Sequence, residues 1–464
     1  MNSETVVSAA EGVTPSGVEA FGYRQELKRS LGLSDLLIYG LVFIVPTAPF
    51  AVFGIVFNAS KGMLPLVYAV GLVAMLFTAF SYMTMSRAFP VAGSVYTYAS
   101  RSLGEVVGFF AGWGILLDYL LTPALIYVLC AIAIHTVVPS VPKGVWVVVL
   151  LTFSTVVNFY GIETATRVNI ALLGLQLVLL LIFLIMGVIE LLHGVGGAHL
   201  SLTPLYNAKL VSPSLIFGAL SLAVLSFLGF DAISTLAEET IGGPHLVGRA
   251  TILSLCIAAF LFVAQTYLAS LFVLGRTSFA RGDATEAAFY AIAQLIGGPW
   301  YKAVVSILGV LVSGIPAALT AQAATARLLY GMARDGKLPR VLSHVQPVRK
   351  VPDYAIAAVA LVTLALGLLL VSQIELLSSM VSFGALLGFF LLHCSVIAHG
   401  WRTGQLRRWL RFLLAPTIGL AIIAYVLVNA QRNAQIAGVA WLVLGVAILF
   451  ALKLSGRSTG LIED

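Results

Sequence analysis

The chain has 464 residues, of which 60% are hydrophobic and 10% are charged, and its formal net charge is +7. A soluble domain carries roughly a quarter charged residues, so this composition excludes a soluble globular protein and predicts an integral membrane protein. The cysteines Cys130, Cys256 and Cys394 all fall inside apolar runs. An odd, scattered set of this kind argues against a disulfide framework or a metal site.

Apolar runs of roughly 20 residues predict about twelve membrane-spanning helices. In chain order these runs lie at 34–57, 64–86, 104–137, 145–161, 166–193, 213–237, 248–274, 301–332, 353–372, 376–400, 411–429 and 434–454. Residues 1–30 and 456–464 are polar and are expected to be tails, the first without a cleavable signal peptide. The sequence thus predicts an all-α polytopic membrane protein.

The distribution of Lys and Arg predicts the orientation. With the N-terminus inside, 19 of the 26 basic residues lie on the cytoplasmic side and 7 lie outside. Because positive residues are retained in the cytoplasm, both termini are expected there. These residues flank helices in short loops, so we expect no binding of nucleic acid. Short tails and loops suit a bacterial inner membrane.

The first helix contains a predicted break. Pro46 and Pro49 lie at mid-span with Thr47 between them. Each proline removes a backbone donor and clashes with the carbonyl four residues earlier. One proline would indicate only a kink, whereas two together favour unwinding.

The sixth helix contains a second predicted break, in Phe227-Leu-Gly229-Phe-Asp231. Glycine weakens a helix, and a carboxylate at membrane depth costs several kcal/mol. Paired breaks five helices apart are typical of inverted repeats in secondary transporters. We therefore expect a transport core at 31–400, made of repeats at 31–195 and 210–400, with helices eleven and twelve appended at 405–455.

Four strings resemble the amino acid/polyamine/organocation (APC) superfamily. They are FLGFDAISTLAEE at 227–239, RAFPVAGSVYTY at 87–98, GFFAGW at 108–113 and ARLLYGMARDGKLP at 326–339. The resemblance implies a LeuT-like fold of five plus five helices with discontinuous helices 1 and 6. It also implies that substrate binds where these helices are broken.

Two departures from the superfamily pattern bear on substrate and coupling. Members that bind α-amino acids usually have a Gly-Ser/Ala-Gly run in the first helix, and its amides suit a carboxylate. Here that place holds Pro46-Thr-Ala-Pro49, which looks more like putrescine and related amine permeases; remaining amides near Ala48 leave amino acids open. Some proton-coupled relatives carry a lysine where this chain has Gln176, and glutamine cannot titrate.

Two carboxylates at membrane depth are the main functional candidates. Asp231 is the candidate for proton coupling, because a desolvated carboxylate can bind and release a proton near neutral pH. Alternatively, Asp231 caps the second half-helix by accepting amides near Ser234. Asp118 in the third helix is a candidate partner for a substrate ammonium; the alternative is a protonated side chain bonded to a neighbouring helix.

The remaining candidates are hydroxyl, aromatic and charged side chains near the breaks. Tyr119, Phe227 and Phe230 would cover an ammonium by cation–π contact, although such residues are more often core or lipid-facing. The expected substrate-binding set is Val45, Pro46, Thr47, Ala48, Asp118, Tyr119, Phe227, Gly229, Phe230 and Ser234. The further expected hydroxyl or ion ligands are Ser313 and Thr320. The expected inner gate is Asp35, Arg87, Glu239 and Arg327, with ordinary interfacial charge pairing as the alternative.

These features predict a secondary active transporter that imports an amino acid or an organic amine such as putrescine by proton symport. Sodium coupling and exchange remain alternatives, and a solute channel fits two broken helices less well. The chain has no phosphate-binding loop, metal-ligand spacing or nucleophile with a nearby base, so we expect no enzyme activity, cofactor or metal. It is expected to be a monomer or homodimer.

Overall fold

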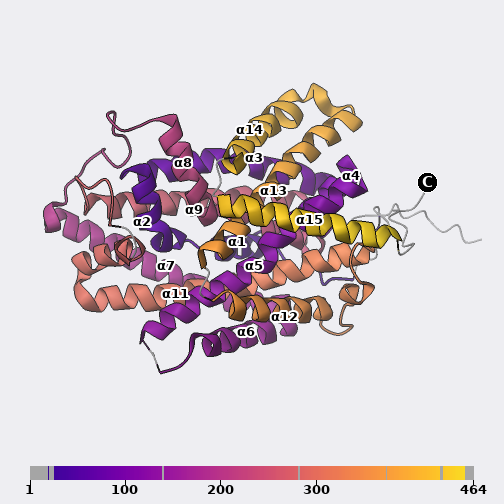
Figure 1. Ribbon diagram of the computed structural model, residues 1–464, viewed down its shortest axis with the longest axis horizontal. Coiled ribbons are helices and arrows are strands. Elements are labelled where there is room, and N and C mark those ends of the chain that lie inside the picture. Colours follow the sequence, from indigo (N-terminus) through magenta and orange to yellow (C-terminus); the bar gives the residue numbers. More distant parts are fainter. Residues whose placement is uncertain are drawn as a thin grey trace, which may run out of the picture.

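The computed structural model describes Glu19 and residues 26–137, 140–280, 283–371, 374–428 and 432–454. The predicted C-terminal tail at 456–464 and most of the predicted N-terminal tail lie outside the described residues. Figure 1 shows long helices packed in one bundle, with α6 at one edge and α14 at the opposite edge. The described chain is helical apart from loops and one isolated parallel bridge between Leu31 and Thr240.

The elements of the first half are α1 (Leu33–Ile44), α2 (Ala48–Ser60), α3 (Leu64–Ala88), α4 (Ser94–Leu103), α5 (Glu105–Val137), α6 (Lys143–Tyr160), α7 (Ile162–Leu192) and η2 (Val195–Gly197). Those of the second half are α8 (Pro213–Ala223), η3 (Val224–Phe227), η4 (Phe230–Glu239), α9 (His245–Leu271), α10 (Asp283–Glu286), α11 (Ala288–Arg334), η5 (Arg340–Ser343), α12 (Asp353–Leu369) and α13 (Ile374–Arg402). The chain ends with η6 (Gln405–Arg407), the π-helical turn η7 (Leu410–Leu414), α14 (Ala415–Val428) and α15 (Arg432–Leu454).

The length and composition of the helices confirm a polytopic membrane protein. Among the described residues, eight helices are long and apolar enough to cross a membrane, and ten if each of two bent pairs forms one span. The other two expected spans coincide with shorter apolar helices, α12 and residues Gln435–Phe450 of α15. The number twelve therefore remains a prediction.

The structure contains the predicted break in the first membrane helix. α1 ends at Ile44, Val45 takes a positive φ of 59°, and α2 begins at Ala48 after a bend of 45°. Pro49 lies in the first turn of α2, where a missing N–H costs little because first-turn amides have no partner within the helix. The prolines thus end one half-helix and start the next.

The second predicted break is also present, and it touches the first. Leu228 is extended, and Gly229 adopts φ 109°, a conformation that favours glycine. The segments Pro213–Leu220 and Val224–Glu239 are bent by 51°. A Cβ at Gly229 would lie 2.9 Å from the backbone carbonyl carbon of Phe43 near the end of α1. The two interruptions therefore meet inside the bundle.

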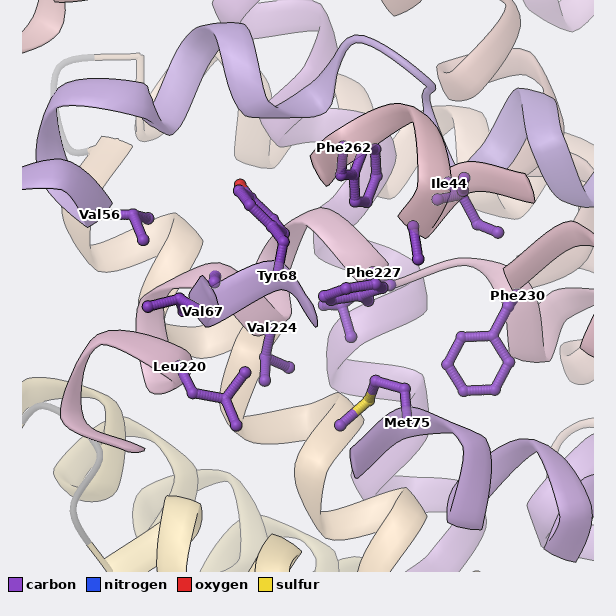
Figure 2. Packing of buried hydrophobic residues seen from close by; sticks show 14 of the residues in the cluster. Ile44, Val56, Val67, Tyr68, Met75, Leu220, Val224, Phe227, Phe230 and Phe262 are labelled. Carbon is purple, nitrogen blue, oxygen red and sulfur yellow. The ribbon is translucent and has the colours of Figure 1, made fainter. Parts of the chain in front are cut away.

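Aromatic packing fixes the second break from both sides. The ring of Phe227 lies 5.8 Å from that of Tyr68 and 5.3 Å from that of Phe262, measured between centroids. Figure 2 shows Phe227 and Phe230 as members of one hydrophobic cluster, with their rings at separate places in it. Phe230 packs instead near Phe389, with a centroid distance of 5.6 Å. The backbone between Phe227 and Phe230 is thus held in place at each end.

Three local features differ from the expectation. The short helix α4 was not expected; it precedes α5 and packs against α5 and α13. α11 starts well before the expected 301–332 span, with a non-helical Gly298 at φ 78° inside it. The described end of the expected N-terminal tail is packed, since Leu27 is buried.

Candidate functional site

Asp231 lies two residues after Gly229 and is almost fully buried. Its Oδ2 accepts a hydrogen bond from the Tyr119 hydroxyl at 2.6 Å, and its Oδ1 accepts one from the Gly229 amide at 3.2 Å. The carboxylate therefore binds the amide exposed by the break. Ser234, whose neighbouring amides the sequence suggested as partners, donates its hydroxyl to Ser94 at 2.8 Å.

Asp118 is the second buried carboxylate, in the middle of α5. Its Oδ1 accepts a hydrogen bond from Thr122 of the same helix at 2.8 Å. It lies near enough to Asp231 for the two charges to interact. Within the described part of the chain, neither carboxylate forms an ion pair with Lys, Arg or His. The interior thus holds two neighbouring carboxyl groups that no described Lys, Arg or His binds.

Tyr119 connects this region to three elements. Its hydroxyl donates to Asp231 of η4, and its backbone carbonyl accepts a hydrogen bond from Thr325 of α11 at 2.6 Å. Its ring centroid lies 6.4 Å from that of Phe43 in α1. Of the three aromatic residues expected to cover an ammonium, the structure brings Tyr119 to a carboxylate, whereas Phe227 packs in the hydrophobic cluster.

Neutral side chains stabilise the break in the first helix. Gln176 Nε2 donates to Thr47 Oγ1 at 2.9 Å, and Thr47 Oγ1 lies 2.7 Å from Ser313 Oγ. Gln265 Nε2 donates to the Pro46 carbonyl at 2.8 Å. These bonds join the break to α7, α9 and α11. Buried polar groups at a helix interruption need such partners, and here they are supplied without charge.

The two other hydroxyl candidates do not share a site. Thr320 follows Ser313 by two turns of α11, which is about 10 Å along the helix. Its hydroxyl accepts from Asn169 Nδ2 at 3.0 Å, and its carbonyl accepts from the Tyr39 hydroxyl at 3.1 Å. Sequence reasoning missed Asn169 and Gln265 as partners, because nothing local in the sequence indicates which distant helix they face.

Two ion pairs lie at the end of the molecule where η4 and α11 finish. Arg327 Nε and Nη2 donate to the two oxygens of Glu239, and both side chains are almost fully buried. Next to them, Arg334 Nη2 donates to Glu238 Oε1 at 2.7 Å, and the Ala92 amide donates to the same oxygen at 2.8 Å. Glu239 and Arg327 are two of the four expected gate residues, whereas Arg334 was not among them.

The other two expected gate residues have different surroundings. Asp35 accepts the Gly32 amide at 2.9 Å and caps the start of α1. Arg87 is exposed in the last turn of α3. Neither forms an ion pair with Glu239 or Arg327. The described ion pairs at this end thus join η4 to α11.

Comparison with known proteins identifies the class of this chain. Residues 36–452 match the family described as amino acid permease. The chain belongs to the amino acid permease family. Membership confirms the resemblance to the APC superfamily, implies its LeuT-like fold, and makes this permease a transporter and not an enzyme.

Individual relatives of the permease differ in the solute that their names state. It is 33% identical to the low-affinity putrescine importer PlaP of Escherichia coli K12 over 445 residues, 94% of this chain and 96% of the relative. It is 27% identical to the branched-chain amino acid permease BcaP of Bacillus subtilis, over 93% and 95% of the two chains. It is 23% identical to the methylthioribose transporter of the same organism, over 92% and 94%. The family therefore leaves the solute of this permease open.

Proposed function

We propose that this permease imports an organic cation, with a diamine such as putrescine as the leading candidate. Asp118 and Asp231 support the assignment, because they are buried, close enough to interact, and not paired with a described cation. Buried charges are normally paired, and an ammonium group of the substrate would supply the partner of Asp118. The 33% identity to a putrescine importer points to the same chemical class.

The hydrogen bond from the Gly229 amide to Asp231 is the observation that favours an amine over an amino acid as the substrate. An α-carboxylate is best held by free amides at the start of a half-helix. At the second break the Gly229 amide is already bound by the chain's own carboxylate. At the first break Pro46 and Pro49 have no N–H, and the Ala48 amide donates to the Val45 carbonyl at 2.8 Å.

The proposed cycle couples the substrate to a proton. Asp231 binds the proton and Asp118 an ammonium on the outer side, and both are released inside after the two half-helix pairs rearrange. Tyr119 positions Asp231 during this cycle through its hydroxyl. Gln176, which cannot titrate, leaves Asp231 as the coupling group. The pair Glu239–Arg327 separates when the inner end opens.

We also propose how the repeats and the termini are arranged relative to the membrane. The repeats at 31–195 and 210–400 form the moving core, and both termini lie in the cytoplasm of a bacterial cell. In that orientation the two buried ion pairs close the cytoplasmic end, consistent with the positive-inside distribution of Lys and Arg. The permease is then closed toward the cytoplasm in this conformation.

The test is uptake of radiolabelled solutes into proteoliposomes, with and without an inward proton gradient. We expect concentrative uptake of putrescine that depends on the gradient, with little uptake of leucine or other neutral amino acids. Efficient uptake of neutral amino acids without amine uptake would overturn the proposal. If solute preloaded inside the vesicles accelerates uptake, and the proton gradient has no effect on it, the protein is instead an exchanger.

A further inference from the structure

A group of arginines gathers where α3 and α4 end, α13 ends and α14 begins. This arginine cluster consists of Arg87, Arg101, Arg402, Arg407, Arg408 and Arg411. Figure 1 shows α14 at the edge of the bundle, so its start faces the surroundings of the protein. None of these residues touches the carboxylates of the proposed substrate site.

The contacts of Arg411 show that the cluster is one arrangement across several helices. Its Nε donates to Thr84 Oγ1 of α3 at 3.1 Å, and its guanidinium lies 5.3 Å from the centroid of the Phe412 ring. Arg87 and Arg408 lie close enough to repel its charge. Arg402 Nη1 reaches the Arg101 carbonyl of α4 at 3.5 Å. The described contacts thus hold several positively charged arginine side chains close to one another.

Five of the six arginines in the cluster have no counter-ion among the described residues. Among the described residues, no Asp or Glu forms an ion pair with Arg87, Arg402, Arg407, Arg408 or Arg411. In contrast, Arg327 and Arg334 at the end of α11 are each paired with a glutamate. Like charges near each other destabilise the folded state unless an anion compensates them. An anion from outside the protein would compensate the positive charge of these arginines.

The neighbouring surface indicates what kind of anion. Trp401 and Trp409 are 75% and 54% exposed, and Leu410 and Leu413 are exposed beside them. Tryptophan is enriched where membrane proteins meet the lipid headgroups, and an exposed apolar surface there contacts acyl chains. Basic pockets between membrane helices are known positions for anionic headgroups. The π-helical turn Leu410–Leu414 contains Arg411, and such turns are frequent at functional sites.

We propose that the arginine cluster binds the phosphate headgroup of an anionic membrane phospholipid. Guanidinium groups donate paired hydrogen bonds to phosphate oxygens, and the exposed Trp and Leu side chains accommodate the acyl chains. A free phosphate ion would use the arginines and leave that apolar surface without a role. The lipid would brace the end of α3, from which the chain runs to Ala92 and its hydrogen bond to Glu238.

The experiment measures lipid binding by native mass spectrometry of the purified full-length permease. Phosphatidylglycerol, phosphatidylcholine and inorganic phosphate are each titrated against the wild type and the variant Arg408→Gln/Arg411→Gln. We expect phosphatidylglycerol to bind the wild type at least about tenfold more tightly than phosphatidylcholine. We expect the double variant to lose about tenfold or more of that affinity, because each basic residue at an anionic surface contributes roughly fivefold.

Matched variants separate a binding role from a structural one. Arg340→Gln removes an exposed arginine from η5, beyond the end of α11, and is expected to bind phosphatidylglycerol like the wild type. Arg411→Lys keeps the charge but loses the paired donors, so it is expected to retain more affinity than Arg411→Gln and less than the wild type. If the double variant does not fold, Arg408→Gln decides the matter, because Arg408 is exposed and its loss is expected to weaken binding about fivefold.

Three results would overturn the proposal. The first is equal affinity of the wild type for phosphatidylglycerol and phosphatidylcholine. The second is unchanged binding of phosphatidylglycerol in the arginine variants that fold. The third is binding of inorganic phosphate that prevents phosphatidylglycerol from binding selectively, which would indicate a site for a free anion.

Discussion

The hydroxyl of Tyr119 donates to Asp231 across 112 residues of sequence, and this 2.6 Å bond joins α5 to the interrupted sixth membrane helix. The same carboxylate binds the Gly229 amide at the interruption. A change in the charge of Asp231 therefore acts on both the break and α5. This relationship connects the proposed coupling group to the element that carries Asp118.

Asp231→Asn is expected to remove most of the pH dependence of amine uptake. The amide keeps the size of the side chain and can still accept from Tyr119, but it cannot exchange a proton in the accessible pH range. Initial uptake rates in proteoliposomes between pH 5.5 and 8.5 test this. Tyr119→Phe is the control, because it leaves the carboxylate in place and should retain a pH-dependent rate. A wild-type pH profile in Asp231→Asn would exclude the coupling role.

Asp118→Asn is expected to weaken amine binding by more than about tenfold while the protein still folds. The loss follows from removing one partner of a buried charge pair, which costs about 2–5 kcal/mol of binding free energy. Competition binding with putrescine measures the affinity. Thr122→Val, which removes only the hydroxyl bonded to Asp118, should cost far less. Unchanged affinity in Asp118→Asn would place the ammonium elsewhere.

Gly229→Ala is expected to destabilise the fold and to abolish transport. A side chain at φ 109° costs about 1–3 kcal/mol in backbone strain. The added Cβ would also lie 2.8 Å from Phe43 Cγ, which forces the two breaks apart. Thermal unfolding in detergent and uptake measure the effects. Gly218→Ala in α8 meets nothing within 4 Å and should be neutral or slightly stabilising; equal behaviour of the two variants would contradict the strain argument.

Breaking the ion pair with Glu239→Gln or Arg327→Gln is expected to cost about 3–5 kcal/mol of stability, because each change leaves a buried charge without its partner. Thermal unfolding of both single variants and of the double variant gives the coupling energy. The double variant should lose less than the sum of the two singles. Lys337→Gln breaks a pair whose glutamate, Glu105, is partly exposed, so the carboxylate left behind keeps contact with solvent and the loss should be smaller. Strictly additive losses would show that the pair is not coupled.

Local sequence chemistry predicted the breaks. Pro46 and Pro49 together favour unwinding of the first helix, and Gly229 beside Asp231 marks the second interruption. Both features act within a few residues of their own position, so no knowledge of the neighbouring helices is needed. The pair Glu239 and Arg327 was predictable as charged residues at one membrane face, although not as partners in a bidentate bond.

The remaining contacts depend on which helices pack together. Gln176 meets Thr47 only because α7 and α1 lie side by side, and Gln265 reaches Pro46 from α9 for the same reason. In a chain where nearly every helix is apolar all round, periodicity does not indicate which face is turned to which neighbour. The role of Phe227 in the hydrophobic cluster was likewise not determined by its position next to the break.

The segment Phe230–Glu239 is a 3₁₀ helix of ten residues, longer than the few residues usual for this form. A 3₁₀ helix rises about 2.0 Å per residue and an α-helix about 1.5 Å. Rewinding this segment as an α-helix would shorten it by about 5 Å and draw Asp231 and Glu239 toward each other. Such a change in winding would convert a local event at one end of the segment into displacement at the other end.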